Sequence, residues 1–217
     1  MEAINSRDRA LQLLQTYFGY TSFRPAQEAP VESLLKNEDV VAIMPTGAGK
    51  SICFQIPALC KSGLTVVFSP LISLMKDQVD GLVDQNIPAA LINSTLTQTE
   101  FNKTMYEVRS GKIKLLYIAP ERLGSNFFCN VLRSMPISQV IVDEAHCISQ
   151  WGHDFRPSYR LIGDWLSSLP KRPVVGAFTA TATKAVENDI KKLLGLDCAN
   201  VYVTGFDRPN LSFSVVR

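Results

Sequence analysis

The octapeptide Met44–Ser51 has the clearest capacity for chemistry, because it follows the apolar run Val40–Ile43 and precedes a helix-compatible stretch. A strand that leads through a Gly-rich turn into a helix points backbone N–H groups and the positive end of the helix dipole at one small volume. Glycines there let the backbone approach a phosphate, a lysine can reach its oxygens, and a serine hydroxyl can ligate Mg²⁺. The alternative is a glycine-containing surface turn. The sequence predicts a nucleoside triphosphate and Mg²⁺ site formed by Thr46, Gly47, Ala48, Gly49, Lys50 and Ser51.

A pair of carboxylates ends another apolar run. Asp143 and Glu144 follow the strand-like segment Gln139–Val142 and begin the sequence Asp-Glu-Ala-His. An isolated pair of this kind would more often be a solvated strand end or a helix cap. Because this pair follows a phosphate-binding segment, we expect Asp143 to hold Mg²⁺ and Glu144 to act as the general base on the attacking water. Lys50 and His146 complete the set of candidate catalytic residues.

An alternation of short β-branched runs with helix-like stretches must position these residues, and it predicts an α/β fold with a mostly parallel sheet and helices on both faces. The expected strands are Val40–Met44, Thr65–Ser69, Ala89–Asn93, Lys114–Ala119, Gln139–Asp143, Val174–Thr179 and Asn200–Thr204. The expected helices are Ser6–Phe18, Pro25–Lys36, Lys50–Leu59, Leu71–Gln85, Gln98–Ser110, Asn126–Ser134, Tyr159–Leu169 and Ala182–Leu194. Pro57 should kink or shorten the third helix, because it removes a hydrogen bond.

Size and composition limit the classes of protein to which the chain can belong. Its 217 residues are 46% apolar, which suits one large α/β domain and excludes a disordered or fibrous class. The net charge of +2 argues against binding nucleic acid by overall charge alone, so any such contact must be local. No apolar run reaches the length of a membrane span, and five scattered cysteines without a C-x-x-C pair indicate neither a zinc site nor a disulfide framework.

Further segments resemble superfamily 2 helicases, and within them the RecQ family of DNA helicases, over nearly the whole chain. Phe23-Arg24-Pro25-Ala26-Gln27, preceded by Phe18-Gly19-Tyr20, is similar to the adenine-recognition motif of that family. The resemblance implies that Gln27 reads the adenine edge while Tyr20 and Arg24 stack on its faces, although an ordinary helix start at Pro25 would also fit. Met44 replaces the usual first glycine of the phosphate loop, a departure that is frequent in helicases.

Other segments resemble the family's DNA-contacting and coupling motifs. Ser69–Gln78 resembles motif Ia and Ala119–Leu123 resembles motif Ib, which implies phosphate contacts from Ser69, Ser73, Lys76 and Arg122. Phe178–Thr183 resembles motif III, which implies that Thr179 and Thr181 couple hydrolysis to DNA. Taken singly, each is more often a plain strand-to-helix turn.

The stretch Cys147–Pro157, directly after His146, is the most discriminating. Its aromatics, histidine and arginine around a glycine predict an ordered loop, and it resembles the aromatic-rich loop with which RecQ helicases sense single-stranded DNA. The alternative is a loop that folds its aromatics into the core. Ser158 stands where many relatives carry an acid. The resemblance implies DNA-sensing roles for Gln150, Trp151, His153, Phe155 and Arg156.

The resemblance implies a RecA-like P-loop lobe that uses ATP and Mg²⁺ and acts on single-stranded and duplex DNA with 3′ to 5′ polarity. We expect residues 1–206 to form this lobe and residues 207–217 to be an exit strand toward a second RecA-like lobe of the same polypeptide. Arginine fingers from that lobe would complete the site, so the chain alone should not unwind DNA efficiently. No membrane association is expected, and the location would be cytoplasmic and nucleoid-associated in a bacterium or nuclear in a eukaryote.

Three other functions remain open on the sequence. An RNA helicase also uses the Asp-Glu-Ala-His sequence, but the aromatic loop and the Gln27 segment argue against it. A small P-loop kinase would need an acceptor pocket and an arginine-bearing lid, for which no segment is apparent. A scaffold that binds ATP without hydrolysing it is disfavoured by the intact Lys50, Asp143 and Glu144.

Overall fold

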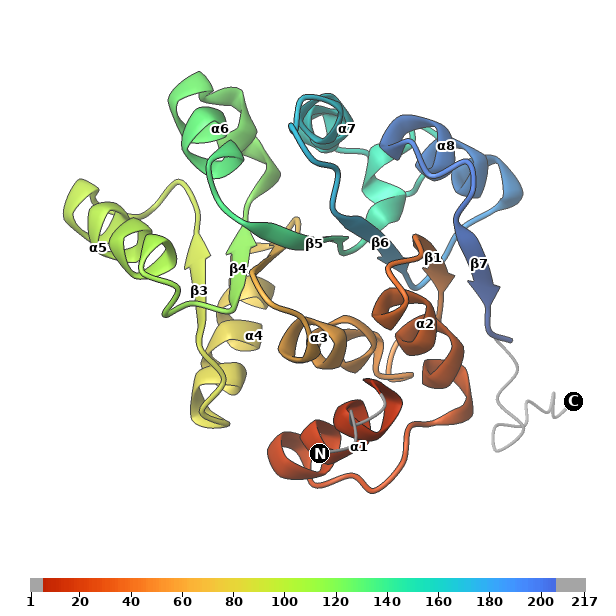
Figure 1. Cartoon of the computed structure of the whole chain (residues 1–217). Helices are drawn as coiled ribbons and strands as arrows, with labels where there is room; N and C mark the ends of the chain where they lie inside the picture. The colour runs from red at the N-terminus through yellow and green to blue at the C-terminus, as the bar shows by residue number, and fades with distance from the viewer. Residues whose placement is uncertain (1–5, 206–217) are drawn as a thin grey trace, which may run out of the picture.

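A parallel sheet forms the centre of the molecule, which a computed structural model describes over residues 6–205 (Figure 1). Within these residues the strand order is β3-β4-β2-β5-β6-β1-β7, and every registered pair is parallel. The strands are β1 Val40–Ile43, β2 Leu64–Phe68, β3 Ala89–Ile92, β4 Leu115–Ile118, β5 Ile137–Val142, β6 Val174–Thr179 and β7 Asn200–Val203. The predicted α/β architecture is confirmed.

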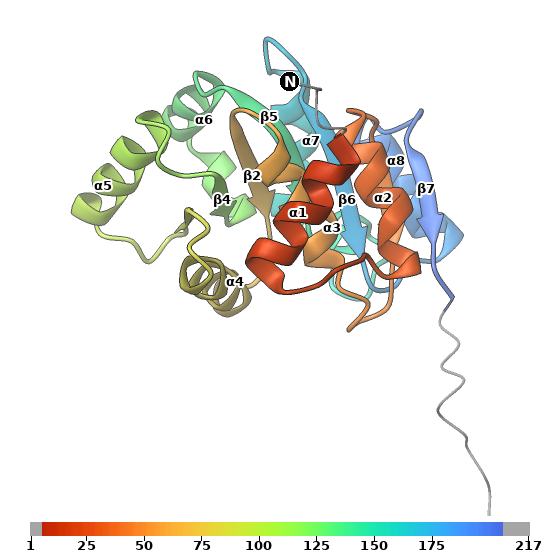
Figure 2. The same cartoon turned by 60° about the horizontal axis from the view of Figure 1, so that its bottom comes forward.

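Helices cover both faces of the sheet. They are α1 Ser6–Phe18, α2 Pro25–Leu35, α3 Lys50–Cys60, α4 Ile72–Asp84, α5 Gln98–Arg109, α6 Asn126–Arg133, α7 Arg160–Ser167 and α8 Lys184–Leu194. One apolar cluster joins the sheet to the first four helices and a second joins it to the last four, so the core has two layers separated by the sheet. Figures 1 and 2 show α1 to α3 on one side of the sheet and α6 to α8 on the other. Three 3₁₀ helices, η1 Pro120–Gly124, η2 Ala145–Ile148 and η3 Pro157–Tyr159, were not expected.

The strand order places the predicted chemistry on one edge of the sheet. Parallel strands end on the same side, and β6 lies directly between β1 and β5. The loop after β1, the acids after β5 and the threonine that ends β6 therefore meet at the carboxyl edge, where ligands bind in open α/β sheets.

Most predicted boundaries differ from the observed ones by one or two residues. The last helix begins at Lys184 rather than Ala182, because the Thr183 hydroxyl accepts a hydrogen bond from the backbone N–H of Val186 and caps it. The expectation that Pro57 shortens α3 is wrong, since that helix continues to Cys60. Pro57 is buried in the core, so packing of this turn offsets the missing hydrogen bond. The predicted exit strand lies outside the described residues.

Candidate functional site

Residues 44–49 form the loop between β1 and α3. Gly47 and Gly49 have φ values of 83° and 82°, a conformation that side chains disfavour. Gly49 also caps α3, and a Cβ atom at that position would lie 2.3 Å from Nε2 of Gln27. The Lys50 ammonium donates to the carbonyl oxygen of Met44 at 3.2 Å, so it is folded onto the loop. The backbone therefore has the shape that a phosphate cradle requires.

Gln27 packs against this same loop from α2. Its amide nitrogen donates to the carbonyl oxygens of Ala48 at 3.2 Å and Gly49 at 3.1 Å, and its amide oxygen accepts from the Arg24 backbone N–H at 2.8 Å. The Arg24 guanidinium donates to the Gly47 carbonyl at 2.8 Å, while Tyr20 is exposed. Two of the three residues proposed to recognise adenine, Arg24 and Gln27, thus contact the phosphate loop. The Gln27 amide nitrogen must exchange at least one partner before it could donate to a base.

Two carboxylates lie at the end of β5, on the edge that carries the phosphate loop. Burial, followed by the charge of Glu144, raises the pKa of Asp143 to about 6, against the opposing effect of Lys50. A hydrogen bond from His146 holds the pKa of Glu144 below its ordinary value, and the charge of Lys50 contributes in the same direction. Lys50 therefore lies close enough to act electrostatically on both acids. Glu144 is ionised at neutral pH and can accept a proton.

Glu144 also has an unusual backbone conformation. Its φ of 47° is left-handed, which a non-glycine residue adopts at a cost of about 1–3 kcal/mol. Its Oε2 lies 3.2 Å from Nδ1 of His146, and this nitrogen lies 2.7 Å from the hydroxyl oxygen of Thr179. Thr179 ends β6, and its hydroxyl also donates to the carbonyl oxygen of Thr181. The structure thus joins the acid segment to the segment that resembles motif III.

The loop after the acid segment exposes part of its aromatic content. Trp151 is 76% exposed and Phe155 is half-buried, with the guanidinium of Arg160 5.2 Å from its ring centre, so Trp151 does not fold into the core. His153 stacks on His146 with ring centres 4.1 Å apart. An exposed aromatic residue is therefore tied to the acid segment through two histidines. Gln150 is exposed as well.

Arg156 anchors this loop rather than extending into solvent. Its guanidinium donates to the carbonyl oxygen of Pro70, within the segment that resembles motif Ia, at 2.7 Å and pairs with Asp154 at 3.0 Å. A direct contact of Arg156 with DNA would have to replace or add to these bonds.

The motif Ia and Ib residues fall into two groups. Ser73 and Lys76 are exposed on the first turns of α4, where phosphates could reach them. Ser69 is 1% exposed and its hydroxyl has no hydrogen-bond partner among the described residues. Arg122 is half-buried, with its guanidinium 5.3 Å from the ring centres of both Phe101 and Phe128. Burial argues against a direct phosphate contact by Ser69 or Arg122, because α5 and α6 already provide a cation–π environment for the arginine.

Sequence reasoning missed residues that hold the site together. The buried Tyr159 donates its hydroxyl to the backbone carbonyl of Asp143 at 2.9 Å. Ser158 donates to the Glu121 carboxylate at 2.9 Å and so connects η3 to η1. The one sequence feature that pointed to the contact between Ser158 and Glu121 was the serine at position 158, where many relatives carry an acid. An acid there would place a second carboxylate against that of Glu121.

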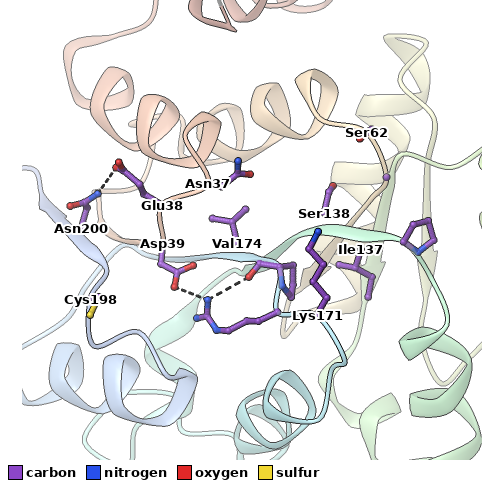
Figure 3. Close-up of a pocket in the computed structure, with 14 residues that line it drawn as sticks. Asn37, Glu38, Asp39, Ser62, Ile137, Ser138, Lys171, Val174, Cys198 and Asn200 are labelled. Atoms are coloured by element: carbon purple, nitrogen blue, oxygen red, sulfur yellow. Dashed lines mark hydrogen bonds and ion pairs between the residues drawn. The ribbon is translucent and has the colours of Figure 1, made fainter.

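Two hollows lie at opposite edges of the sheet. A cavity of about 370 Å³ at the carboxyl edge is lined by residues of the phosphate loop, the acid segment and the aromatic loop, including Thr46, Glu144, His146 and His153. A larger hollow of about 1110 Å³ lies at the amino ends of the strands, where the ion pair between Asp39 and Arg172 lies (Figure 3). We assign the chemistry to the smaller cavity, because Thr46 of the phosphate loop and Glu144 of the acid segment both line it.

The family model for DEAD/DEAH box helicases matches residues 24–189 of the chain. This chain belongs to the DEAD/DEAH box helicase family. The ATP-dependent DNA helicase RecQ of Pasteurella multocida is 48% identical over 97% of the chain and 33% of that protein. RecQ of Bacillus subtilis is 50% identical over 96% of the chain and 36% of that protein. The chain thus spans about a third of the length of these relatives.

Solved structures share the fold at low sequence identity. The helicase domain of Pyrococcus furiosus Hef superposes with a TM-score of 0.67 at 18% identity, covering 86% of this chain and 39% of that one. The DUF1998 helicase MrfA bound to DNA gives a TM-score of 0.73 at 15% identity, covering 94% and 30%. Among residues 6–205, no helix has the length and apolar character needed to cross a bilayer.

The residues present fit a bound Mg²⁺ ion. No cluster of three or more His, Cys, Asp or Glu side chains that could hold a metal occurs within the described residues. Mg²⁺ bound with a nucleotide needs no such cluster, because phosphates and waters supply most of its ligands. Asp143 accepts one hydrogen bond, from the Glu144 backbone N–H, so its other carboxylate oxygen can face a hydrated ion.

Proposed function

We propose that this chain is the ATP-binding N-terminal lobe of a RecQ-type, ATP-dependent DNA helicase that moves 3′ to 5′ along single-stranded DNA during recombination and repair. The supporting observation is that the acid segment contacts both the aromatic loop and the end of β6 at the carboxyl edge of the sheet. There His146 contacts Glu144 and Thr179 and stacks on His153, two residues from the exposed Trp151. The sequence identity to RecQ proteins over nearly the whole chain supports the same assignment.

In this proposal each residue at the edge has a separate task. The N–H groups of Gly47, Gly49 and the first turn of α3 would bind the phosphates, and Lys50 would exchange the Met44 carbonyl for the β/γ oxygens. Mg²⁺, held by the Ser51 hydroxyl and the Asp143 carboxylate directly or through water, would supply positive charge against the phosphates. Glu144 would take a proton from the attacking water, which its low pKa and its hydrogen bond from His146 permit.

The proposed partners are single-stranded and duplex DNA and a second RecA-like lobe whose arginine fingers stabilise charge at the γ-phosphate. Ser73 and Lys76 would contact the DNA backbone, and Trp151 would stack on an unpaired base. Gln150, Phe155 and Thr181 stay candidates for the same surface. The location would be cytoplasmic and nucleoid-associated in a bacterium or nuclear in a eukaryote.

Competition between single-stranded DNA and RNA of equal length, measured by fluorescence anisotropy in the presence of Mg²⁺ and a non-hydrolysable ATP analogue, tests this proposal. DNA should bind more tightly, and Trp151→Ala should weaken DNA binding by about 1–3 kcal/mol. Tyr106→Ala is the matched control, because Tyr106 is 68% exposed on α5 and lies outside the proposed DNA surface. Equal binding of RNA, or an equal loss in both variants, would contradict the assignment. Rapid unwinding by residues 1–217 alone would contradict the need for a second lobe.

A further inference from the structure

Three side chains, Gln55 of α3, Gln78 of α4 and Tyr117 of β4, are joined by hydrogen bonds. None of them is among the nucleotide and DNA residues described above. Gln55 on α3 is 4% exposed. Its amide nitrogen donates to Gln78 Oε1 at 3.3 Å and to the Tyr117 hydroxyl at 3.2 Å. Tyr117 is 1% exposed, so the amide provides a hydrogen bond that water cannot supply to its hydroxyl.

Each of these residues belongs to an element that leads to a predicted ligand contact. Gln55 follows Ser51 by four residues, so the two side chains lie one turn apart on one face of α3. Gln78 is on α4, whose first turns carry Ser73 and Lys76. Tyr117 is on β4, which ends at Ile118, directly before the segment that resembles motif Ib.

We infer that Gln55 is a positioning residue that couples the phosphate loop to the segments that resemble motifs Ia and Ib through Gln78 and Tyr117. The inference rests on the proposed function and names residues for its coupling step. A helix moves as a rigid element, so a shift of the first turn of α3 around bound phosphate displaces Gln55 as well. Because the amide is buried, α4 and β4 must follow it or lose hydrogen bonds that water does not replace. Burial raises the pKa of Tyr117 against the opposing effect of the hydrogen bond from Gln55, so the tyrosine hydroxyl stays neutral.

A second buried glutamine provides a matched control. Gln139 on β5 is 0% exposed, and its amide nitrogen donates to the backbone carbonyl of Phe54 at 3.0 Å. Phe54 lies on α3, the helix that also carries Gln55. The amide oxygen of Gln139 has no partner among the described residues, and its hydrogen bond to α3 leads to neither α4 nor β4. Gln139→Met therefore removes a buried amide beneath α3 without cutting the proposed connection.

Hydrogen exchange of residues 1–217, with and without Mg²⁺ and a non-hydrolysable ATP analogue, tests the inference. In the unmodified chain the analogue should slow exchange in residues 44–51 and change it in residues 72–77 and 119–124. Gln55→Met should keep the first response and lose both distant ones, whereas Gln139→Met should keep all three. A merely structural role would instead change exchange of the nucleotide-free chain and leave the distant responses in place.

Variants of the two hydrogen-bond partners of Gln55 test each branch of the connection separately. They also serve as the test if Gln55→Met does not fold. Tyr117→Phe should lose only the response of residues 119–124, and Gln78→Met should lose only that of residues 72–77. Distant responses that persist in Gln55→Met, or that are absent from the unmodified chain while residues 44–51 are protected, overturn the inference. Absence of protection in residues 44–51 overturns the proposed nucleotide site, and the coupling role with it.

Discussion

Substitution of Asp143 by asparagine should stabilise the metal-free chain. Burial raises the pKa of Asp143 from 3.8 to about 6, so the folded state binds a proton more tightly than the unfolded state does. The free energy of unfolding must then fall as the pH rises from 3.8 to about 6, and it stays lowered above that range. The difference corresponds to about 3 kcal/mol at pH 7, an upper limit because Asp143 retains some exposure. Asparagine removes the charge and can still accept from the Glu144 N–H.

The assay is urea unfolding between pH 3.5 and 7.5 in EDTA, because a bound metal would itself shift the pKa of Asp143. We expect Asp143→Asn to unfold at higher urea at pH 7 and to lose stability less steeply between pH 4 and 6. The same variant should bind Mg²⁺ and ATP more weakly, since it removes the proposed ligand charge. Asp164→Asn, at an exposed position of α7, is the control and should change little. A destabilised Asp143→Asn at pH 7, or an unchanged pH profile, would refute the argument.

Three further variants test the other parts of the site. Gly49→Ala should lower the free energy of unfolding by about 1–3 kcal/mol in urea titrations, because φ is 82° and the new Cβ would meet Gln27; an unchanged midpoint would contradict this. Glu144→Gln should keep the affinity for a fluorescent ATP analogue but reduce hydrolysis in a two-lobe form about 10²–10⁴-fold, and undiminished hydrolysis would exclude it as the base. Arg122→Ala should cost about 1–2 kcal/mol of stability through its two ring contacts, whereas a loss of DNA affinity at full stability would restore it as a DNA contact.

The elements were predictable because their signals are local. Strands such as Val174–Thr179 are continuous apolar runs, which a sheet covered on both faces requires, and the helix before the first strand begins at a proline as expected. The errors have local causes too. The Thr183 cap outweighed a helix start at Ala182, and packing around Pro57 outweighed its missing hydrogen bond.

The contacts of the site were less predictable than its location. The edge could be predicted, because strand ends of a parallel sheet meet and chemically capable residues follow the strands. The placement of Arg122 between two rings depends on helices that begin more than twenty residues before it and a few residues after it. Gln27 likewise contacts carbonyls more than twenty residues away. No periodic pattern records such tertiary partners, so the sequence could not predict that Arg122 and Gln27 also have partners within the protein.

The left-handed backbone at Glu144 bears on how one short segment could serve the two proposed ligands, Mg²⁺ and the attacking water. In an ordinary helical or extended conformation, consecutive acids would point to different sides of the strand end. At Glu144 the φ is left-handed and the carboxylate contacts His146, while the Tyr159 hydroxyl donates to the carbonyl of Asp143. The contacts of His146 with Thr179 and His153 then extend this geometry to the segments proposed to bind DNA. Because these contacts connect Glu144 to the aromatic loop, we expect movement of that loop to alter the position of the proposed base, as hydrolysis that depends on DNA would require.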